Sequence, residues 1–216
     1  KFSVENVKFL LKFDVKLIVV ACNTASSIAL SSLMFHFKIP IVGVIRPGAK
    51  EAVRLTKNKR IGVIGTKTTV LSESYEDEIK RYDKSIKVIS QSCPLFVPLV
   101  EEGLIRDSVT KEMAQRYLKP LKKAKVDTLI LGCTHYPLLK YIIKDVMGSG
   151  VNLVDSAHQT AKEVRGLILE KGLVNSLKVI PRHDFYVSDE PYNFIKIGRR
   201  FLGKALKHVE RVKEDV

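Results

Sequence analysis

Two cysteines in this sequence stand where a thiol can act as an acid or a base. Cys22 and Cys133 each follow a short apolar run and precede polar residues that open a helical pattern. A thiol between a strand and a helix lies near unpaired backbone N–H groups and the positive end of the helix dipole, which stabilise a thiolate. We interpret both cysteines as candidate proton-transfer groups; the alternative for each is a small packing residue in a strand–helix turn.

The two cysteines belong to a weak internal repeat. Val15–Thr24 lines up with Val126–His135: a buried strand, a small residue, Cys and then polar residues. The repeat predicts two related α/β lobes, each with a cysteine at the carboxyl end of a strand, where open α/β sheets bind ligands. Two groups that face each other across one carbon can remove a proton from one side and return one from the other, which is the chemistry of racemisation.

Several residues beside the cysteines have side chains that suit this chemistry. Asn23 and Thr24 can cap the helix or donate to an anion. His135 can exchange a proton with Cys133 or with a substrate; the less favoured alternative is a histidine that caps the helix that Pro137 begins.

Further candidates follow other predicted strands. Thr66 and Thr69 follow Gly65 and can bind a carboxylate; a phosphate loop is excluded because Thr66, not Gly, precedes Lys67. Glu101 and Glu102 follow an apolar run, so one of them is a candidate supporting base, or simply a charge at a helix start. We interpret Cys93 as a packing residue and Asp155 as a helix cap.

The three cysteines form no C-x-x-C pair, and two separated strand ends with one histidine make a poor metal site. We therefore expect no metal, no disulfide framework and a reducing cytoplasm. The chain has 216 residues, of which 45% are hydrophobic and 28% charged. No apolar run approaches the roughly 20 residues that span a bilayer, so we expect no membrane partner.

The net charge of +14 leaves a nucleic-acid partner as an alternative. The basic clusters at 54–60, 119–125 and 196–213 are far apart and lack interleaved aromatic residues. We favour solvated faces and an anionic small-molecule substrate over nucleic acid.

Short β-rich runs alternate with longer amphipathic ones, which predicts an α/β fold with mostly parallel sheets. We expect strands at 17–20, 41–45, 61–65, 87–89, 128–131, 151–154 and 184–189, and helices at 4–13, 25–37, 74–82, 107–123, 138–146, 157–171 and 192–210. We assign residues 1–46 and 156–216 to a first lobe that carries Cys22, and residues 47–155 to a second lobe that carries Cys133, with the active site between them.

Two segments, Val19–Ala25 (Val-Val-Ala-Cys-Asn-Thr-Ala) and Leu131–Leu139 (Leu-Gly-Cys-Thr-His-Tyr-Pro-Leu-Leu), resemble the signature motifs of glutamate racemases. The segments at 62–66, 93–103, 154–156 and 185–189 resemble that family in the same order, so the resemblance covers essentially the whole chain. In the related aspartate racemases Glu usually follows the second Cys-Thr, so His135 favours glutamate.

The resemblance implies a cofactor-independent enzyme that interconverts L- and D-glutamate and supplies D-glutamate for peptidoglycan. It implies that Cys22 deprotonates the D-enantiomer with help from Glu101, and that Cys133 deprotonates the L-enantiomer with help from His135. The substrate would be held by Asn23, Thr24, Thr66, Thr69, Thr134 and His135. We also expect a homodimer.

The family's first strand, with its Asp-Ser-Gly loop, and its Pro-Tyr-Gly segment have no counterpart in this sequence. We therefore expect the 216-residue chain alone to have little or no activity. The alternatives are a racemase or isomerase for aspartate or another small acid, and a non-catalytic basic protein that binds nucleic acid.

Overall fold

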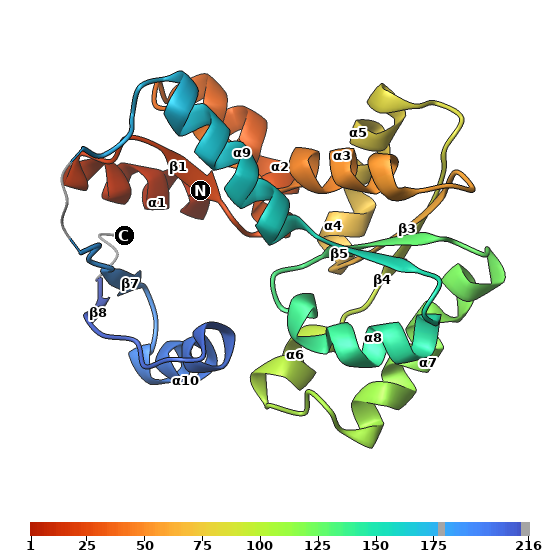
Figure 1. Cartoon of the computed structure of the whole chain (residues 1–216). Helices are drawn as coiled ribbons and strands as arrows, with labels where there is room; N and C mark the ends of the chain where they lie inside the picture. The colour runs from red at the N-terminus through yellow and green to blue at the C-terminus, as the bar shows by residue number, and fades with distance from the viewer. Residues whose placement is uncertain (177–179, 213–216) are drawn as a thin grey trace. The chain divides into compact units, whose positions relative to one another are not determined.

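The computed structural model describes residues 1–176 and 180–212 and has parallel β-sheets flanked by helices (Figure 1). This arrangement confirms the predicted α/β class. The chain divides into two compact units, Lys1–Val174 and Asn175–Val216. The lobe boundaries predicted near residues 46 and 155 stay a prediction.

The smaller sheet of the first unit carries the Cys22 segment. Its two parallel strands are β1 (Ile18–Val20) and β2 (Ile41–Gly43). Helix α1 (Phe2–Leu10), the short η1 (Leu11–Phe13) and helix α2 (Asn23–His36) complete this part. Val7 and Leu33 from the helices pack with Ile18 and Ile41 from the strands. This small core fixes the direction in which α2 leaves the end of β1.

The larger sheet carries the Cys133 segment and has four parallel strands in the order β4-β3-β5-β6. The strands are β3 (Arg60–Gly65), β4 (Lys87–Ser92), β5 (Thr128–Gly132) and β6 (Asn152–Asp155). All five residues of β5 are buried. Burial on both faces explains why residues 129–131 are continuously apolar rather than alternating.

Helices cover both faces of the larger sheet (Figure 1). On one face, α3 (Ile45–Leu55) and α5 (Ser74–Tyr82) pack against alternate strand residues such as Ile61 and Ile130. On the other face lie α6 (Phe96–Glu101), α7 (Ser108–Lys123) and α8 (Lys140–Met147). The remaining elements of this unit are α4 (Lys67–Leu71), η2 (Tyr136–Leu139) and α9 (Ser156–Glu170). Helix α9 packs on α3 and also contacts β2, so it joins the two sheets.

Three helices of the described residues, α3, α4 and α6, lie outside the predicted helix ranges. Helix α3 begins at Ile45, which the sequence pattern placed at the end of a strand, because Pro47 lies in the first helical turn, where a missing N–H costs little. Helix α6 is only six residues long, too short for a periodic signal. Glu101 is its last residue, so it is not a charge at a helix start.

The predicted helix over 192–210 is wrong in its second half. Helix α10 (Pro191–Leu202) ends because Gly203 adopts a left-handed conformation with φ of 66°. Residues Val209–Arg211 instead form β8, which pairs in parallel with β7 (Phe185–Val187). Helical spacing continued past Gly203 in the sequence, but the glycine terminates the helix.

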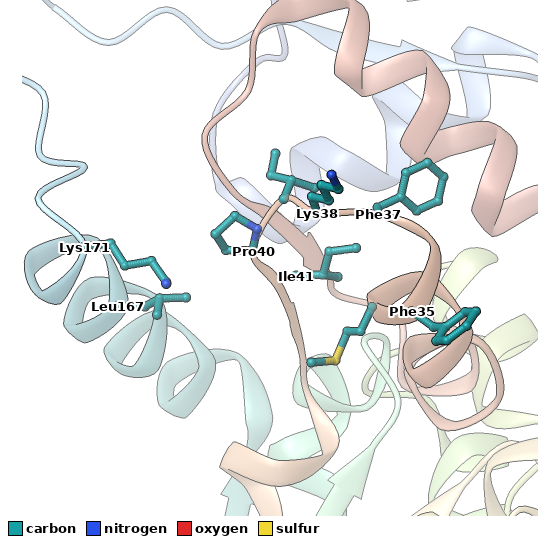
Figure 2. Close-up of a pocket in the computed structure, with 9 residues that line it drawn as sticks. Phe35, Phe37, Lys38, Pro40, Ile41, Leu167 and Lys171 are labelled. Carbon is teal, nitrogen blue, oxygen red and sulfur yellow. The ribbon is translucent and has the colours of Figure 1, made fainter.

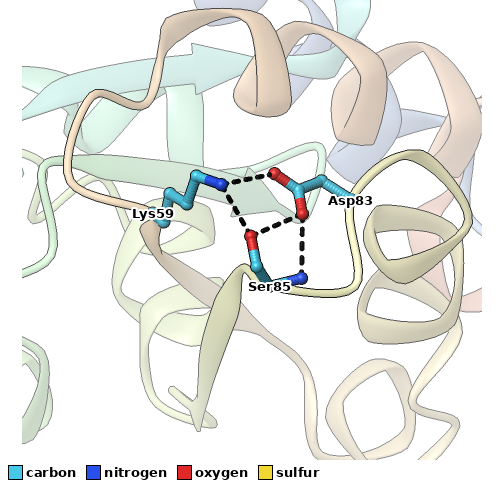
Figure 3. A network of polar contacts seen from close by, with 3 residues as sticks. All are labelled: Lys59, Asp83 and Ser85. Atoms are coloured by element: carbon cyan, nitrogen blue, oxygen red, sulfur yellow. Dashed lines mark hydrogen bonds and ion pairs between the residues drawn. The ribbon is translucent and has the colours of Figure 1, made fainter.

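Lys59, from the basic cluster at 54–60, belongs to a polar network at the amino end of the larger sheet (Figure 3). Lys59 Nζ lies 2.7 Å from Ser85 Oγ and 3.2 Å from Asp83 Oδ2. Asp83 Oδ1 accepts from the backbone N–H of Ser85 at 2.8 Å and from its hydroxyl at 2.6 Å. The network ties the starts of β3 and β4 together, which is a structural role. Within residues 1–176 and 180–212, no helix is long and apolar enough to cross a membrane.

Candidate active site

Cys22 stands at the start of α2, two residues after β1 ends. It is the N-cap residue of the helix, its carbonyl accepts from Ser26 N–H at 2.8 Å, and its side chain is exposed. Ser26 in turn donates to the Val20 carbonyl at 2.7 Å, which anchors the first turn of α2 to β1. The predicted placement of this thiol at a helix N-terminus is confirmed.

Cys133 directly follows β5 and is 7% exposed. Burial raises the pKa of its thiol, while the backbone N–H groups of His135 and Tyr136 lower it in part by stabilising the thiolate. Pro137 lies in the first turn of η2, as predicted, so Cys133 occupies the turn between strand and helix.

The two cysteine segments come from different sheets yet lie near one another. The Tyr75 hydroxyl lies 2.6 Å from Oδ1 of Asn23, the residue after Cys22, and a Cβ placed on Gly132, the residue before Cys133, would lie 3.1 Å from the ring of the same tyrosine. The charge of a Cys22 thiolate adds to the rise in the pKa of the Cys133 thiol. That coupling suits a pair in which one thiol and one thiolate alternate.

A carboxylate, an imidazole and a thiol lie in a row on the Cys133 side. Glu101 Oε1 lies 3.3 Å from His135 Nε2, and His135 Nδ1 lies 3.9 Å from Cys133 Sγ. A carboxylate at Nε2 favours the tautomer with its proton there, which makes Nδ1 an acceptor that faces the thiol. The expected assistance of Glu101 to Cys22 stays a prediction; Glu101 also contacts His135, on the Cys133 side.

Three threonine hydroxyls form a triangle between α2 and the first turn of α4. Thr24 Oγ1 lies 2.8 Å from Thr66 Oγ1 and 3.1 Å from Thr69 Oγ1, and the last two are 3.0 Å apart. These predicted residues thus meet, although they are 42 and 45 positions apart in the sequence. Hydroxyls that bond one another can rotate to donate to a carboxylate instead. Thr134 lies on the other side of the site, with its Oγ1 3.3 Å from His135 Nδ1.

Asn23 has a buried partner that the sequence did not reveal. The Tyr75 hydroxyl donates to Asn23 Oδ1 at 2.6 Å and lies 3.0 Å from Ser156 Oγ. Tyr75 is 2% exposed, and burial raises the pKa of its phenol. In the sequence Tyr75 is one apolar position of an amphipathic helix, so no local signal distinguished it from an ordinary core residue.

The other polar candidates have structural roles. Asp155 caps α9 through Ala157 N–H at 3.0 Å and pairs with Lys140 at 2.7 Å. Cys93 is fully buried in the core, where burial raises the pKa of its thiol. Among the residues that the structure describes, no three His, Cys, Asp or Glu side chains are grouped to hold a metal ion.

An apolar groove of 490 Å³ lies at the far end of α2 from Cys22 (Figure 2). It is lined by Phe35, Phe37, Pro40 and Ile41 on one side and by Leu167 and Lys171 of α9 on the other. A 14-residue helix is about 20 Å long at about 1.5 Å per residue, so the groove is remote from the thiols. Its titratable lining residues are Lys38 and Lys171, and none of the candidate site residues lines it, so it is not the candidate active site.

Comparisons with known proteins identify the family. The Asp/Glu/hydantoin racemase family model matches residues 4–164. The chain is 47% identical to a glutamate racemase of Geobacter metallireducens over 98% of this chain and 78% of that protein.

Solved structures are similar over the whole chain. A glutamate racemase from Bacillus anthracis superimposes with a TM-score of 0.94 at 40% identity, over 100% of this chain and 80% of that one. A glutamate racemase from Francisella tularensis, solved in complex with D-glutamate, superimposes with a TM-score of 0.92 at 35% identity, over 99% and 80% of the two chains. The chain belongs to the Asp/Glu/hydantoin racemase family.

Proposed function

We propose that this chain is a glutamate racemase that interconverts L- and D-glutamate without a cofactor, with Cys22 and Cys133 as its two acid/base groups. The observation that carries the proposal is that two thiol-bearing turns, at the ends of β1 and β5 in different sheets, both contact one side chain, Tyr75. The similarity to glutamate racemases over nearly the full chain supports glutamate as the substrate.

In the proposed reaction, one thiolate removes the Cα proton of glutamate and the opposite thiol returns a proton to the other face. The C–H electron pair stays on the substrate as a carbanion until reprotonation, so the two cysteines end with their protonation states exchanged. Cys22 acts on the D-enantiomer and Cys133 on the L-enantiomer. No oxidant or reductant is needed.

The hydroxyl and amide groups around the thiols would hold the substrate. Thr24, Thr66 and Thr69 are placed to donate to a carboxylate once their mutual hydrogen bonds open. Asn23 and Thr134 flank the two thiols directly in sequence and complete the proposed set. The basic net charge favours approach of the anionic substrate.

His135 and Glu101 would serve Cys133. His135 accepts the proton of the thiol through Nδ1, and Glu101 orients the ring from Nε2. The same arrangement gives Glu101 an indirect role, through the imidazole, rather than direct assistance to Cys22.

The remaining inferences concern the setting of the enzyme. We infer that the enzyme works in a reducing compartment such as the cytoplasm, because the mechanism requires free thiols. We also infer that it is a homodimer. Its D-glutamate would enter peptidoglycan synthesis.

The test is substrate turnover measured with high sensitivity. The purified chain, at tens of micromolar, is incubated for hours with L- or D-glutamate, and the opposite enantiomer is separated by chiral chromatography. We expect each enantiomer of glutamate to yield the other, and aspartate to react far more slowly. Faster turnover of aspartate than of glutamate would assign the chain to the alternative small-acid substrate and would refute the proposal.

A further inference from the structure

Tyr75 touches both cysteine-bearing segments, although it lies in neither. Its hydroxyl lies at the N-terminal ends of two helices, 2.6 Å from Asn23 Oδ1 in α2 and 3.0 Å from Ser156 Oγ in α9. Asn23 is the residue after Cys22, so this hydroxyl holds the first turn of α2 from the side of the larger sheet.

The hydrogen-bond direction in this trio is fixed by the number of protons available. A phenol has one proton, and here it goes to the carboxamide oxygen of Asn23. Ser156 must then donate to the Tyr75 oxygen, which gives the order Ser156 to Tyr75 to Asn23. Because the carboxamide oxygen is held by the phenol, the NH₂ group of Asn23 is turned away from Tyr75. The planar amide is thereby set in one of its two orientations.

The ring of Tyr75 packs against the other cysteine segment. A Cβ placed on Gly132, the residue before Cys133, would lie 3.1 Å from Tyr75 Cε2 and 2.7 Å from the backbone oxygen of Ile64. A side chain at position 132 would therefore displace either the ring or the strand. Gly132 lets the ring sit directly beside the end of β5.

We propose that Tyr75 is a positioning residue that sets the separation of the two thiol-bearing turns and the orientation of Asn23. The inference rests on the proposed racemase function and deepens it. Tyr75 acts through other residues: its hydroxyl acts through Asn23 on the Cys22 side, and its ring acts through Gly132 on the Cys133 side. It is not a proton donor to the substrate.

The first test compares Tyr75→Phe, which keeps the ring and removes the hydroxyl, with Tyr82→Phe on the same helix, where the side chain is 43% exposed. We expect Tyr75→Phe to lower kcat/KM for glutamate about ten- to hundredfold, since small misplacements of reacting groups cost up to this much. Part of the loss should be a higher KM, because Asn23 loses its orientation. A merely structural role would lower the fraction of active protein and leave KM unchanged. Tyr82→Phe should match the unsubstituted chain.

A double-mutant cycle tests whether the hydroxyl acts through Asn23. In an Asn23→Ala background, Tyr75→Phe should lower kcat/KM by less than about threefold, because the acceptor of the hydroxyl is already gone. Fully multiplicative losses would show that the phenol acts elsewhere and would overturn the inference.

A measurement independent of activity separates this inference from the proposed function. Hydrogen exchange at the backbone amides of residues 26–29, which close the first turn of α2, should be at least about tenfold faster in Tyr75→Phe than in Tyr82→Phe, because the turn has lost its anchor. Unchanged exchange there overturns the positioning role, whatever the activity. If the unsubstituted chain fails to interconvert glutamate, the proposed function fails and the exchange data still decide the role of Tyr75.

Ser156→Ala provides a second variant if Tyr75→Phe does not fold. It removes only the donor to the phenol oxygen, so the same changes in KM and exchange are expected at a smaller size, about threefold. No change in either readout would contradict the proposed relay.

Discussion

The carboxylate of Asp127 fixes the start of the strand that delivers Cys133, and its replacement by asparagine should destabilise the protein measurably. Asp127 Oδ1 accepts from the Thr56 hydroxyl at 2.6 Å. Oδ2 accepts from the backbone N–H groups of Lys57 and Asn58, each at 2.7 Å. The residue after Asp127 begins β5, so these bonds clamp the loop before β3 onto the entry to β5.

The expected magnitude follows from what Asp127→Asn removes. The amide oxygen can keep the two backbone donors and the NH₂ group can face Thr56, whose hydroxyl can turn to accept. The variant therefore loses mainly the charge assistance on three partly exposed bonds. That loss is about 2 kcal/mol, given that hydrogen bonds to charged groups are worth about 1.5–3 kcal/mol each and are not additive. The corresponding fall in the unfolding temperature is about 4–8 °C for a chain of this size.

The pH dependence identifies the charge as the cause. Burial acts to raise the pKa of Asp127, but the hydrogen bonds from Thr56, Asn58 and Lys57 outweigh it, and the pKa lies below its ordinary value. A carboxyl with a lowered pKa in the folded state contributes its full stability above the unfolded value, near 3.9. The contribution is lost as the pH falls from there through the folded pKa. The difference in the free energy of unfolding between the unsubstituted chain and Asp127→Asn should therefore be constant near neutral pH. It should disappear as the pH falls below about 4.

The assay is urea unfolding followed by circular dichroism between pH 3 and pH 8, with Asp14→Asn as the matched control. Asp14 is exposed and has a φ of 51°, which asparagine adopts readily, so its replacement should change little. A gap under about 0.5 kcal/mol at pH 7, the range of ordinary surface substitutions, would refute the reasoning, as would a gap that persists unchanged at pH 3.

Two further substitutions test other contacts of the site. Glu101→Gln should lower glutamate turnover about three- to tenfold, because a half-exposed carboxylate contributes about 1 kcal/mol through its contact with His135. Glu102→Gln, at the adjacent exposed position, is the control; equal losses would show that the contact has no catalytic role. Gly132→Ala should destabilise the fold by about 1–3 kcal/mol and abolish most activity, since the new Cβ would lie 2.7 Å from the Ile64 oxygen. Gly166 is in an exposed helical position where an added Cβ would have nothing within 4 Å, so Gly166→Ala should instead stabilise the protein by about 0.5–1 kcal/mol. Both predictions are tested by comparing the urea unfolding midpoint of each variant with that of the unsubstituted chain.

The sequence predicted strands β1 to β7 and the placement of both cysteines because those features are local. Continuous apolar runs such as 128–131 are buried on both faces, and the polar residues after Cys22 and Cys133 open the next helical elements. The threonine triangle was anticipated in its members, since each follows a strand. Its closure at 2.8 to 3.1 Å depends on how α2 meets α4, which no local pattern encodes.

The contacts that depend on tertiary packing could not be predicted. Tyr75 belongs to a helix on the face of the larger sheet, and its hydroxyl partners are 52 and 81 residues away in the sequence. Glu101 was assigned to Cys22 by resemblance, whereas the short helix α6 brings it to His135. Helix α10 was extended too far because helical periodicity persists beyond the glycine that ends it.

The central claim is that the two thiols act on opposite faces of one carbon. Cα deuterium incorporation and racemisation are followed together in D₂O, starting from each pure enantiomer, for the unsubstituted chain, Cys22→Ser and Cys133→Ser. Both variants should lose at least about 10²-fold in racemisation, the contribution of a positioned acid or base. Residual exchange with retained configuration should be confined to L-glutamate in Cys22→Ser and to D-glutamate in Cys133→Ser. Racemisation within tenfold of the unsubstituted rate in either variant, or exchange without preference for an enantiomer, would contradict the account.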